Sequence, residues 1–398
     1  MAWTAKEAPM AFKLAATGQA WGAEQTIGAG SGIKQGKIDF PLGLPEIKAE
    51  ETTDAAWATV LDMGDVKPID FSLEYPLRYN PSTSIDPYSQ ILMAVLYDGT
   101  SVATPGGGTN SRLHTGTIAS NHALSNSVSR FGTLAWRDKL VAAGYGYTAL
   151  QSWQPDGFEL TSASGGTEPV KVKISGKGDR VLTDQTTPAT ANTATPWGNV
   201  TYVTDTNLAH HRHIGATGCW FAKSAAVGGS TVTFGTSQAV KPQELSIKFS
   251  RKYEGFHTTT MYADQPIDNG FAECEVTMKF PHMLDAYWTG LIKDAKDYEA
   301  AGVESAYHLK WRYTFPTVIE GSLYPYFEIG IPRMILKSVK MSKDAGKVIP
   351  LEATFTALQP TAYAHLPTCF QYVGGTSGAA MDCLYVAVQN TCTTAYIA

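Results

Sequence analysis

Two ten-residue segments of this chain match each other without a gap, and this internal repeat constrains the fold more than any other feature. Residues 66–75 (VKPIDFSLEY) align with residues 240–249 (VKPQELSIKF), and 240 minus 66 gives a spacing of 174. Each begins Val-Lys-Pro and then alternates apolar and polar residues, which indicates a β-strand with one buried face. The initial proline suits the first residue of a strand. We expect these strands to bury Ile69, Phe71, Leu73, Tyr75, Leu245, Ile247 and Phe249.

A second match follows in each half of the sequence. Phe158, Leu160, Gly165, Pro169, Val170, Val172 and Ile174 align with Val339, Met341, Gly346, Pro350, Leu351, Ala353 and Phe355, and 339 minus 158 gives a spacing of 181. Both copies read as a strand, a turn with glycine, a proline and a second alternating strand, which is the pattern of a β-hairpin. Two matches in the same order favour a duplicated unit.

The repeats divide the chain into five parts. We expect an N-terminal arm at 1–36, a first repeat at 37–185, a connector at 186–235, a second repeat at 236–360 and a C-terminal segment at 361–398. The first repeat contains a polar insertion at 100–129, rich in Gly, Ser, Thr and Asn. Such long loops are usually functional or ordered by a partner. The C-terminal segment carries enough apolar residues to pack on its own chain or on a neighbour.

The fold class that follows is mainly β, built from two tandem β-sandwich or β-barrel modules that each carry a short helix. Thirty-seven glycines and twenty-one prolines point to short strands and turns. Asp86-Pro87 before an apolar stretch predicts one helix, ending near Gly99. Apolar residues at helical spacing over 284–298 predict a second, and 134–143 is a third, shorter candidate.

Charge and composition exclude several classes of protein. Thirty-one basic and thirty-six acidic residues leave a net charge of −5, whereas proteins that grip nucleic acid usually have a basic excess. Residues 37–75 hold nine acids and three lysines, a local charge of −6. That stretch is either a solvated acidic face or a surface that repels another polyanion. No signal peptide or bilayer-spanning run is recognised, and five scattered cysteines favour reduced thiols.

The sequence offers little support for catalysis, a cofactor or a metal. Gly28 to Ile33 does not complete a dinucleotide-binding GxGxxG, and no GxSxG nucleophile motif is present. His210, His211 and His213, with Cys219 nearby, are the nearest approach to a zinc cluster, but an exposed histidine-rich loop explains them better. Glu273 and Glu275 could form a glycosidase pair, yet they alternate with Cys274 and Val276 and fit the outward face of a strand.

The two β-rich halves resemble the major tail tube proteins of long-tailed (siphovirus-type) bacteriophages. The residues that carry this resemblance are 66–75, 158–176, 240–249 and 338–358. It implies a structural virion protein whose sheets join in rings around an inner β-barrel, and whose rings stack into a tube that conducts DNA. Such rings are commonly hexameric, and the duplicated chain raises the alternative of a trimer with pseudo-sixfold symmetry. It implies as partners the terminator, tape measure and distal tail proteins, with double-stranded DNA as passing cargo and no membrane. It places the protein in the phage tail, assembled in the host cytoplasm.

Within that resemblance, we expect an acidic lumen that lets DNA slide, because attraction to many phosphates would hold it. The lumen candidates are Asp39, Glu46, Glu50, Glu51, Asp54, Asp62 and Asp65. Two alternatives remain open. One is another β-rich virion component, such as a decoration, baseplate or receptor-binding protein. The other, less favoured, is a carbohydrate-active β-sandwich enzyme that uses some of the nine tryptophans and nineteen tyrosines as sugar platforms.

Overall fold

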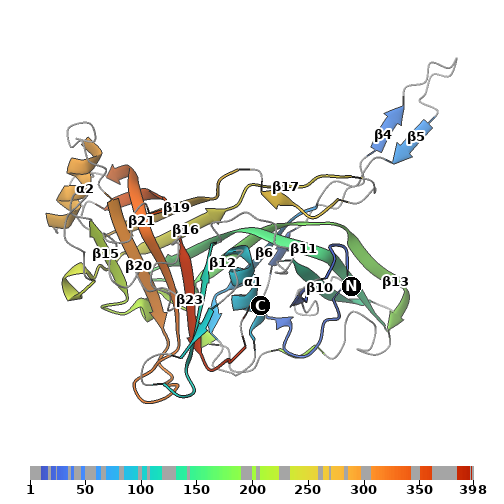
Figure 1. Ribbon diagram of the computed structural model, residues 1–398, viewed down its shortest axis with the longest axis horizontal. Helices are drawn as coiled ribbons and strands as arrows, with labels where there is room; N and C mark the ends of the chain where they lie inside the picture. Colours follow the sequence, from blue (N-terminus) through green and yellow to red (C-terminus); the bar gives the residue numbers. More distant parts are fainter. Residues whose placement is uncertain are drawn as a thin grey trace.

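The structure, a computed structural model, is mainly β, as the sequence predicts (Figure 1). Within the described residues it has 23 strands and two α-helices, and none of its helices has the length and apolar character needed to cross a bilayer. It describes residues 10–16, 19–23, 25–34, 37–39, 46–49, 60–63, 69–79, 85–96, 101–104, 108–118, 131–140, 144–189, 200–202, 207–223, 234–258, 263–268, 270–281, 286–296, 306–341, 350–360, 383–394 and 396.

In the first half of the chain, six of the described strands pair in one antiparallel sheet that carries one helix. In chain order these are β1 (Met10–Leu14), β3 (Lys37–Asp39), β6 (Ile69–Pro76), α1 (Pro87–Leu96), β10 (Gly132–Leu140), β11 (Gly144–Ala163) and β12 (Lys171–Gly178). Their pairings give the order β3-β6-β12-β11-β10-β1 across the sheet. Helix α1 packs on β1 and β11.

The second half repeats this arrangement. Its elements in chain order are β15 (Cys219–Lys223), β16 (Glu244–Ser250), β19 (Glu273–Phe280), α2 (Ala286–Lys296), β20 (Ala306–Thr314), β21 (Tyr326–Met341) and β22 (Leu351–Ala357). They pair in the order β16-β19-β22-β21-β20-β15, and α2 packs on β21. Each half therefore has the same succession of elements along the chain and the same order of strands in the sheet.

Both halves have shorter elements at corresponding places. A hairpin of β4 (Glu46–Ala49) and β5 (Val60–Met63) lies between β3 and β6 in the chain. A hairpin of β17 (Tyr253–Glu254) and β18 (Ile267–Asp268) lies between β16 and β19. Strands β13 (Val181–Ala189) and β23 (Tyr385–Asn390) pair with the beginnings of β11 and β21. The remaining elements are β2 (Gly32–Ile33), β7 (Arg78–Tyr79), β8 (Ser101–Ala103), β9 (Arg112–Thr117), β14 (Asn207–Leu208), η2 (His211–Ile214) and η3 (Thr236–Gln238).

The two predicted hairpins are confirmed, but the VKP segments do not occupy corresponding places. In the hairpins, Leu160 lies opposite Val172, and Met341 lies opposite Leu351. The latter pairing makes Val172, not the aligned Val170, the counterpart of Leu351. Strand β6, which follows the first VKP, corresponds by pairing to β19, whereas β16, which follows the second, corresponds to β3. Period-two alternation reports only that one face is buried, so it does not distinguish neighbouring strands of one sheet.

Two of the three helix predictions are confirmed. Pro87 opens α1, and the backbone N–H of Ser89 donates to Oδ1 of Asp86 at 2.8 Å, which makes Asp86 the cap. Helix α2 lies inside the predicted 284–298. The predicted helix at 134–143 is wrong, because residues 132–140 form β10 between β1 and β11. Pairing on both edges outweighs the local helical pattern.

One large hydrophobic core runs through both halves. Phe71, Leu73, Tyr75, Leu245, Ile247 and Phe249 all contribute to it and are at most 2% exposed, while Ile69 is partly buried at its border. Trp153 and Trp311 lie in the same core with no exposed surface. The halves are thus packed together and not merely linked.

The segments outside the repeats also belong to the sheet where they are described. Met10 and Phe12 of β1 are buried, so the stretch before residue 36 supplies an integral strand. Part of the polar insertion forms the β8–β9 hairpin, and β9 pairs with β23 of the C-terminal segment. Because β23 also pairs with β21, residues 383–396 pack on their own chain and tie the insertion to the second half.

Candidate assembly interface

The two halves are joined strand to strand. The last seven residues of β11 pair with all seven residues of β16, from Gly157 opposite Ser250 to Ala163 opposite Glu244. The rings of Phe158 and Phe249 face each other across this joint at 5.6 Å between centroids. In Figure 1, β11 and β16 lie where the two lobes meet. The sheet therefore continues without a break from β3, β6, β12 and β11 of one half to β16, β19, β22 and β21 of the other. We call this continuous sheet the inner sheet.

Gly157 allows this close approach. Strand β11 has a register shift between Pro155 and Gly157, which re-aims the strand as it leaves β10 for β16. A Cβ atom at Gly157 would lie 2.8 Å from the carbonyl oxygen of Phe249 and 2.9 Å from Oγ of Ser175. The backbone of β16 thus fills the space that any side chain at position 157 would need.

Arg251 connects β16 to the helix of the other half. It follows the last residue of β16 and is only 3% exposed. Its Nε donates to the carbonyl oxygen of Val95 at 3.2 Å, and its Nη2 donates to that of Leu96 at 2.6 Å. These carbonyls end α1 and have no partner within the helix. A cation at this end also interacts favourably with the helix dipole.

His211, in η2 of the connector, bridges the two halves at the other end of the joint. Its Nε2 lies 3.0 Å from the carbonyl oxygen of Pro242, and its Nδ1 lies 2.8 Å from Oγ of Ser162. The carbonyl can only accept, so Nε2 carries the proton and Nδ1 accepts from the Ser162 hydroxyl. Burial lowers the pKa of His211, which favours this neutral form.

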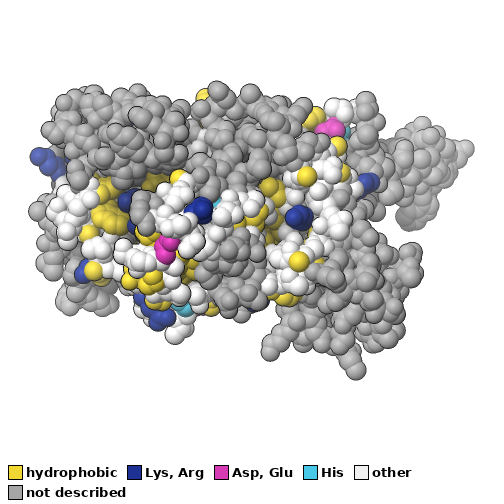
Figure 2. All heavy atoms as spheres, turned by 60° about the horizontal axis from the view of Figure 1, so that its bottom comes forward, with side chains coloured by type: hydrophobic (Ala, Val, Ile, Leu, Met, Phe, Trp, Pro, Cys, Tyr) yellow, Lys and Arg dark blue, Asp and Glu magenta, His cyan; other side chains and the backbone are white. Residues whose placement is uncertain are grey.

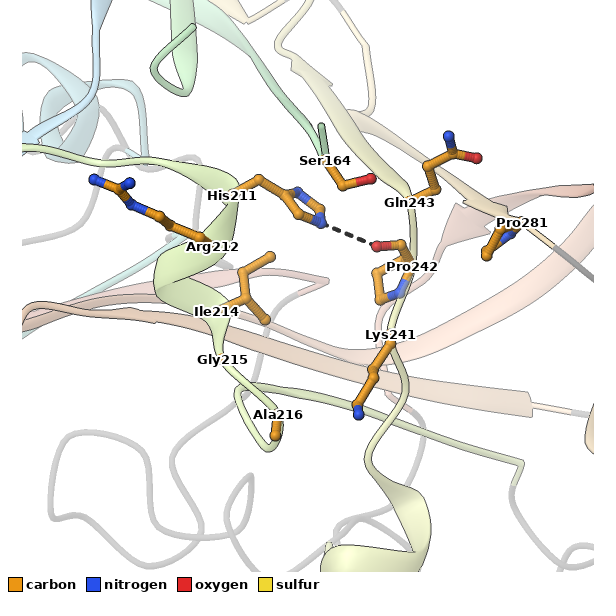
Figure 3. A pocket seen from close by; sticks show the side chains of 10 residues that line it. All are labelled: Ser164, His211, Arg212, Ile214, Gly215, Ala216, Lys241, Pro242, Gln243 and Pro281. Carbon is orange, nitrogen blue, oxygen red and sulfur yellow. Dashed lines mark hydrogen bonds between the residues drawn. The ribbon is translucent and has the colours of Figure 1, made fainter. Parts of the chain in front are cut away.

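A cavity of about 510 Å³ opens beside His211 (Figure 3). Its lining comes from the end of β11, the η2 turn and the segment before β16, and includes Ser164, Arg212, Lys241 and Gln243. Arg212 and Lys241 are exposed, and none of the described lining residues is acidic. The cavity marks the end of the joint, where the paired strands diverge.

Two further strand edges are equivalent to the two edges of the joint, but no described strand pairs with them. Beyond Ile335, β21 extends past β20, and within the described residues this stretch pairs only with β22. It corresponds to the part of β11 that receives β16. Strand β3, which corresponds to β16, pairs only with β6 within the same residues. The described part of the chain thus has one complete joint and one unpaired copy of each of its two sides.

The predicted lumen acids are spread over several places. Asp39 lies in β3, with its backbone opposite Ser72. Glu46 and Asp62 lie in the β4–β5 hairpin, which projects from the body of the molecule (Figure 1). Glu50, Glu51, Asp54 and Asp65 lie outside the described residues. The structure therefore brings Glu46 and Asp62 into one hairpin and separates them from Asp39.

Other candidate sites have structural roles. No group of three or more metal-ligating side chains occurs in the described part of the chain. Glu273 and Glu275 lie on the polar face of β19, where they pair with Lys252 at 3.1 Å and Lys337 at 2.5 Å. No sequence motif marks Gly157 or Arg251, and the sequence offered His211 either as a zinc ligand or as part of an exposed histidine-rich loop. The register shift beside Pro155, which marks Gly157, is visible only in the structure.

Comparison with known proteins identifies no relative, since no family model and no curated protein sequence matches this chain.

We expect Gly157→Val to destabilise the joint selectively. The added side chain would collide with β16 backbone, and overpacking of this kind costs about 1–3 kcal/mol. Urea unfolding measures the loss. Gly166→Val is the matched control, because a Cβ there meets nothing closer than 3.7 Å and the site is an exposed turn. Equal stability of the two variants would contradict the close approach of β11 and β16.

The stability contributed by His211 should depend on pH. Its folded pKa lies below its unfolded value of about 6.5, so this contribution is present at neutral pH and is lost as pH falls below about 6.5. His211→Gln should cost about 1 kcal/mol for each hydrogen bond lost at pH 7.5. Thermal melts at pH 7.5 and 5.5 should show that the difference between wild type and variant shrinks on acidification.

Burial also lowers the pKa of His114, His213 and His308, and these three residues are present in both proteins, so the comparison isolates His211. A difference that stays constant or grows at pH 5.5 would contradict the assigned tautomer.

Proposed function

We propose that this chain is a structural subunit that polymerises head to tail into rings, and that stacked rings form a phage tail tube for DNA passage. The observation that carries the proposal is the joint between β11 and β16. It is a strand-to-strand contact between two halves of the same topology, and its two sides recur on β21 and β3, where no described strand fills them. The resemblance of the sequence to tail tube proteins supplies the identity of the tube.

The ring follows from repetition of the joint. If β21 of one copy pairs with β3 of the next as β11 pairs with β16, each copy uses one side of each kind. Such a heterologous contact closes into a ring when its rotation divides a full turn. Each chain fills two equivalent places, so a ring with six places needs three chains. Closure removes the two open strand edges, which would otherwise pair with any exposed strand.

The two hairpins support the same arrangement. The β17–β18 connection of the second half lies over the first half, where Nε1 of Trp21 donates to the carbonyl oxygen of Ala263 at 3.0 Å. Nε2 of Gln265 also donates to Oε1 of Gln154 at 2.9 Å. The β4–β5 hairpin holds the corresponding place in the first half, and it projects beyond the body (Figure 1). In a ring it would lie over the second half of the next copy.

A tube subunit needs no catalytic group, and we propose none. The carbohydrate-active alternative would need aromatic platforms that face solvent. Trp153 and Trp311 instead lie fully inside the core. Trp220 is half-buried and covered by the ammonium group of Lys310, 4.5 Å from its ring.

The purified chain should form rings or tubes at high concentration, visible by negative-stain electron microscopy. Ser338→Pro and Val339→Pro test which edge is used. Successive N–H groups of a strand point to opposite neighbours. Ser338→Pro should therefore remove a hydrogen bond to β22, and Val339→Pro should remove a donor from the open edge of β21. The first variant should melt at a lower temperature. The second should melt close to wild type and yet fail to assemble.

If the variant that keeps its melting temperature assembles as well as wild type, β21 is excluded as an interface. A wild-type chain that stays monomeric at all concentrations would exclude the ring.

Replacing residues 46–63 by a short Gly-Ser linker should leave the subunit folded, because β4 and β5 form a separate two-stranded sheet. We expect an unchanged melting temperature and a higher critical concentration for assembly, measured by light scattering. Unchanged assembly would show that the hairpin does not contact the next copy.

A further inference from the structure

The inner sheet has one apolar face, which enters the core, and one polar face. The polar face spans β3, β6, β12, β11, β16, β19, β22 and β21, and so crosses the joint between the halves. Its acidic side chains, among those the structure describes, are Asp70, Glu74, Asp156, Glu159, Glu244, Glu273, Glu275 and Glu352. Its basic side chains in the same set are Lys37, Lys171, Lys173, Lys177, Lys248, Lys279, Arg333, Lys337 and Lys340. Eight acids against nine basic residues leave this face with almost no net charge, in contrast to the acidic lumen expected from the sequence.

The charges of this face also alternate in sign from strand to strand. The pairing register places six residues side by side across six neighbouring strands, in the order Lys37, Glu74, Lys173, Glu159, Lys248 and Glu275. The row begins on β3 and ends on β19. Its step from Glu159 to Lys248 crosses the joint, so the alternation is continuous between the two halves.

A second alternating row lies in the other half of the sheet. Glu244, Lys279, Glu352 and Lys340 stand opposite one another on β16, β19, β22 and β21. Between the two charged rows runs a row of hydroxyl side chains, Thr161, Ser246, Thr277, Thr354 and Ser338. Ion pairs join Lys279 to Glu244 at 2.8 Å and Lys177 to Asp70 at 2.7 Å.

Cross-strand pairs of opposite charge stabilise any antiparallel sheet, and that accounts for single pairs. It does not account for an uninterrupted row over six strands that is also neutral in sum. On the face shown in Figure 2, the Lys and Arg side chains of the described residues are scattered among apolar and polar groups.

We infer that this polar face is the wall that meets double-stranded DNA, and that its alternating charges keep DNA from binding. The inference rests on the proposed tube. The Cβ atoms of paired residues lie about 5 Å apart, which is shorter than the Debye length of about 8 Å at physiological salt. The fields of paired opposite charges therefore largely cancel at the distance of a passing phosphate. With almost no net cation excess, few counterions are released on contact, so little holds the DNA.

The test removes the acidic charges of the row that runs from Lys37 to Glu275. Glu74→Gln, Glu159→Gln and Glu275→Gln combined leave three lysines of the row without their acidic neighbours. The matched control changes the lysines Lys37→Gln, Lys173→Gln and Lys248→Gln. Binding of a labelled DNA duplex to the full chain is followed by fluorescence anisotropy over a range of salt, after melting curves confirm that both variants fold.

We expect no binding by wild type or by the lysine variant. The glutamate variant should bind, with a slope of log K against log salt of about −3, since each phosphate neutralised contributes about −0.9. Binding by wild type, or no gain by the glutamate variant, would overturn the role of the alternation.

Tubes assembled from the glutamate variant with DNA locate the face. We expect the bound DNA to resist nuclease, as it would inside a closed tube, and complete digestion would overturn the assignment of this face to the wall. Failure of wild type to form tubes would overturn the proposed function and the wall with it. The anisotropy experiment still decides the effect of the alternating charges in that case, so the two failures are distinguishable.

Discussion

The backbone pairing of β11 with β16 is the contact on which the rest of the structure depends. A sheet edge carries a row of unpaired N–H and C=O groups, and burying such groups unpaired is costly. By pairing over seven residues, the two halves satisfy one edge each and place their apolar faces in one core. A tandem arrangement can satisfy only the edges that meet at the joint, so among the described residues the edges of β3 and of β21 beyond Ile335 remain unpaired at the two ends of the row of strands.

The complete joint shows what the open edges would require of a neighbour. Gly157 leaves room for the β16 backbone, and the position that corresponds to it by the hairpin pairing is Ser338, also a small residue. Arg251 and His211 add contacts that fix the angle between the halves, because one holds the end of α1 and the other holds the segment before β16. A joint between copies can repeat the strand pairing without repeating these side chains. The backbone therefore carries the common geometry, while the side chains distinguish the permanent joint from an assembly contact.

The sequence predicted the elements better than their partners. Alternation identified β6 and β16 and their buried residues, and glycine and proline identified both hairpins. The alternation also aligned β6 with β16, because Phe71 and Leu245 follow the same period. The two strands are told apart only by their partners, since β6 pairs with β12 and β16 pairs with β19. Residues 134–143 read as a helix locally, yet two flanking strands impose an extended backbone. Gly157, Arg251 and His211 act between segments far apart in the chain, so no local pattern marks their roles.

The distribution of charge has a consequence for how a conduit of this kind would work. An acidic wall repels DNA through a field that salt screens, so passage would become sensitive to ionic strength. A wall whose charges cancel between adjacent strands has no long-range field to screen, and its contact with DNA stays weak over a wide range of salt. The acids expected to line a lumen include Glu46 and Asp62, which belong to the projecting hairpin and not to the sheet. Acidity on a projecting element would act between subunits or at the mouth of a ring, while in the proposed tube the sheet itself would meet the cargo as a hydrated, nearly neutral surface.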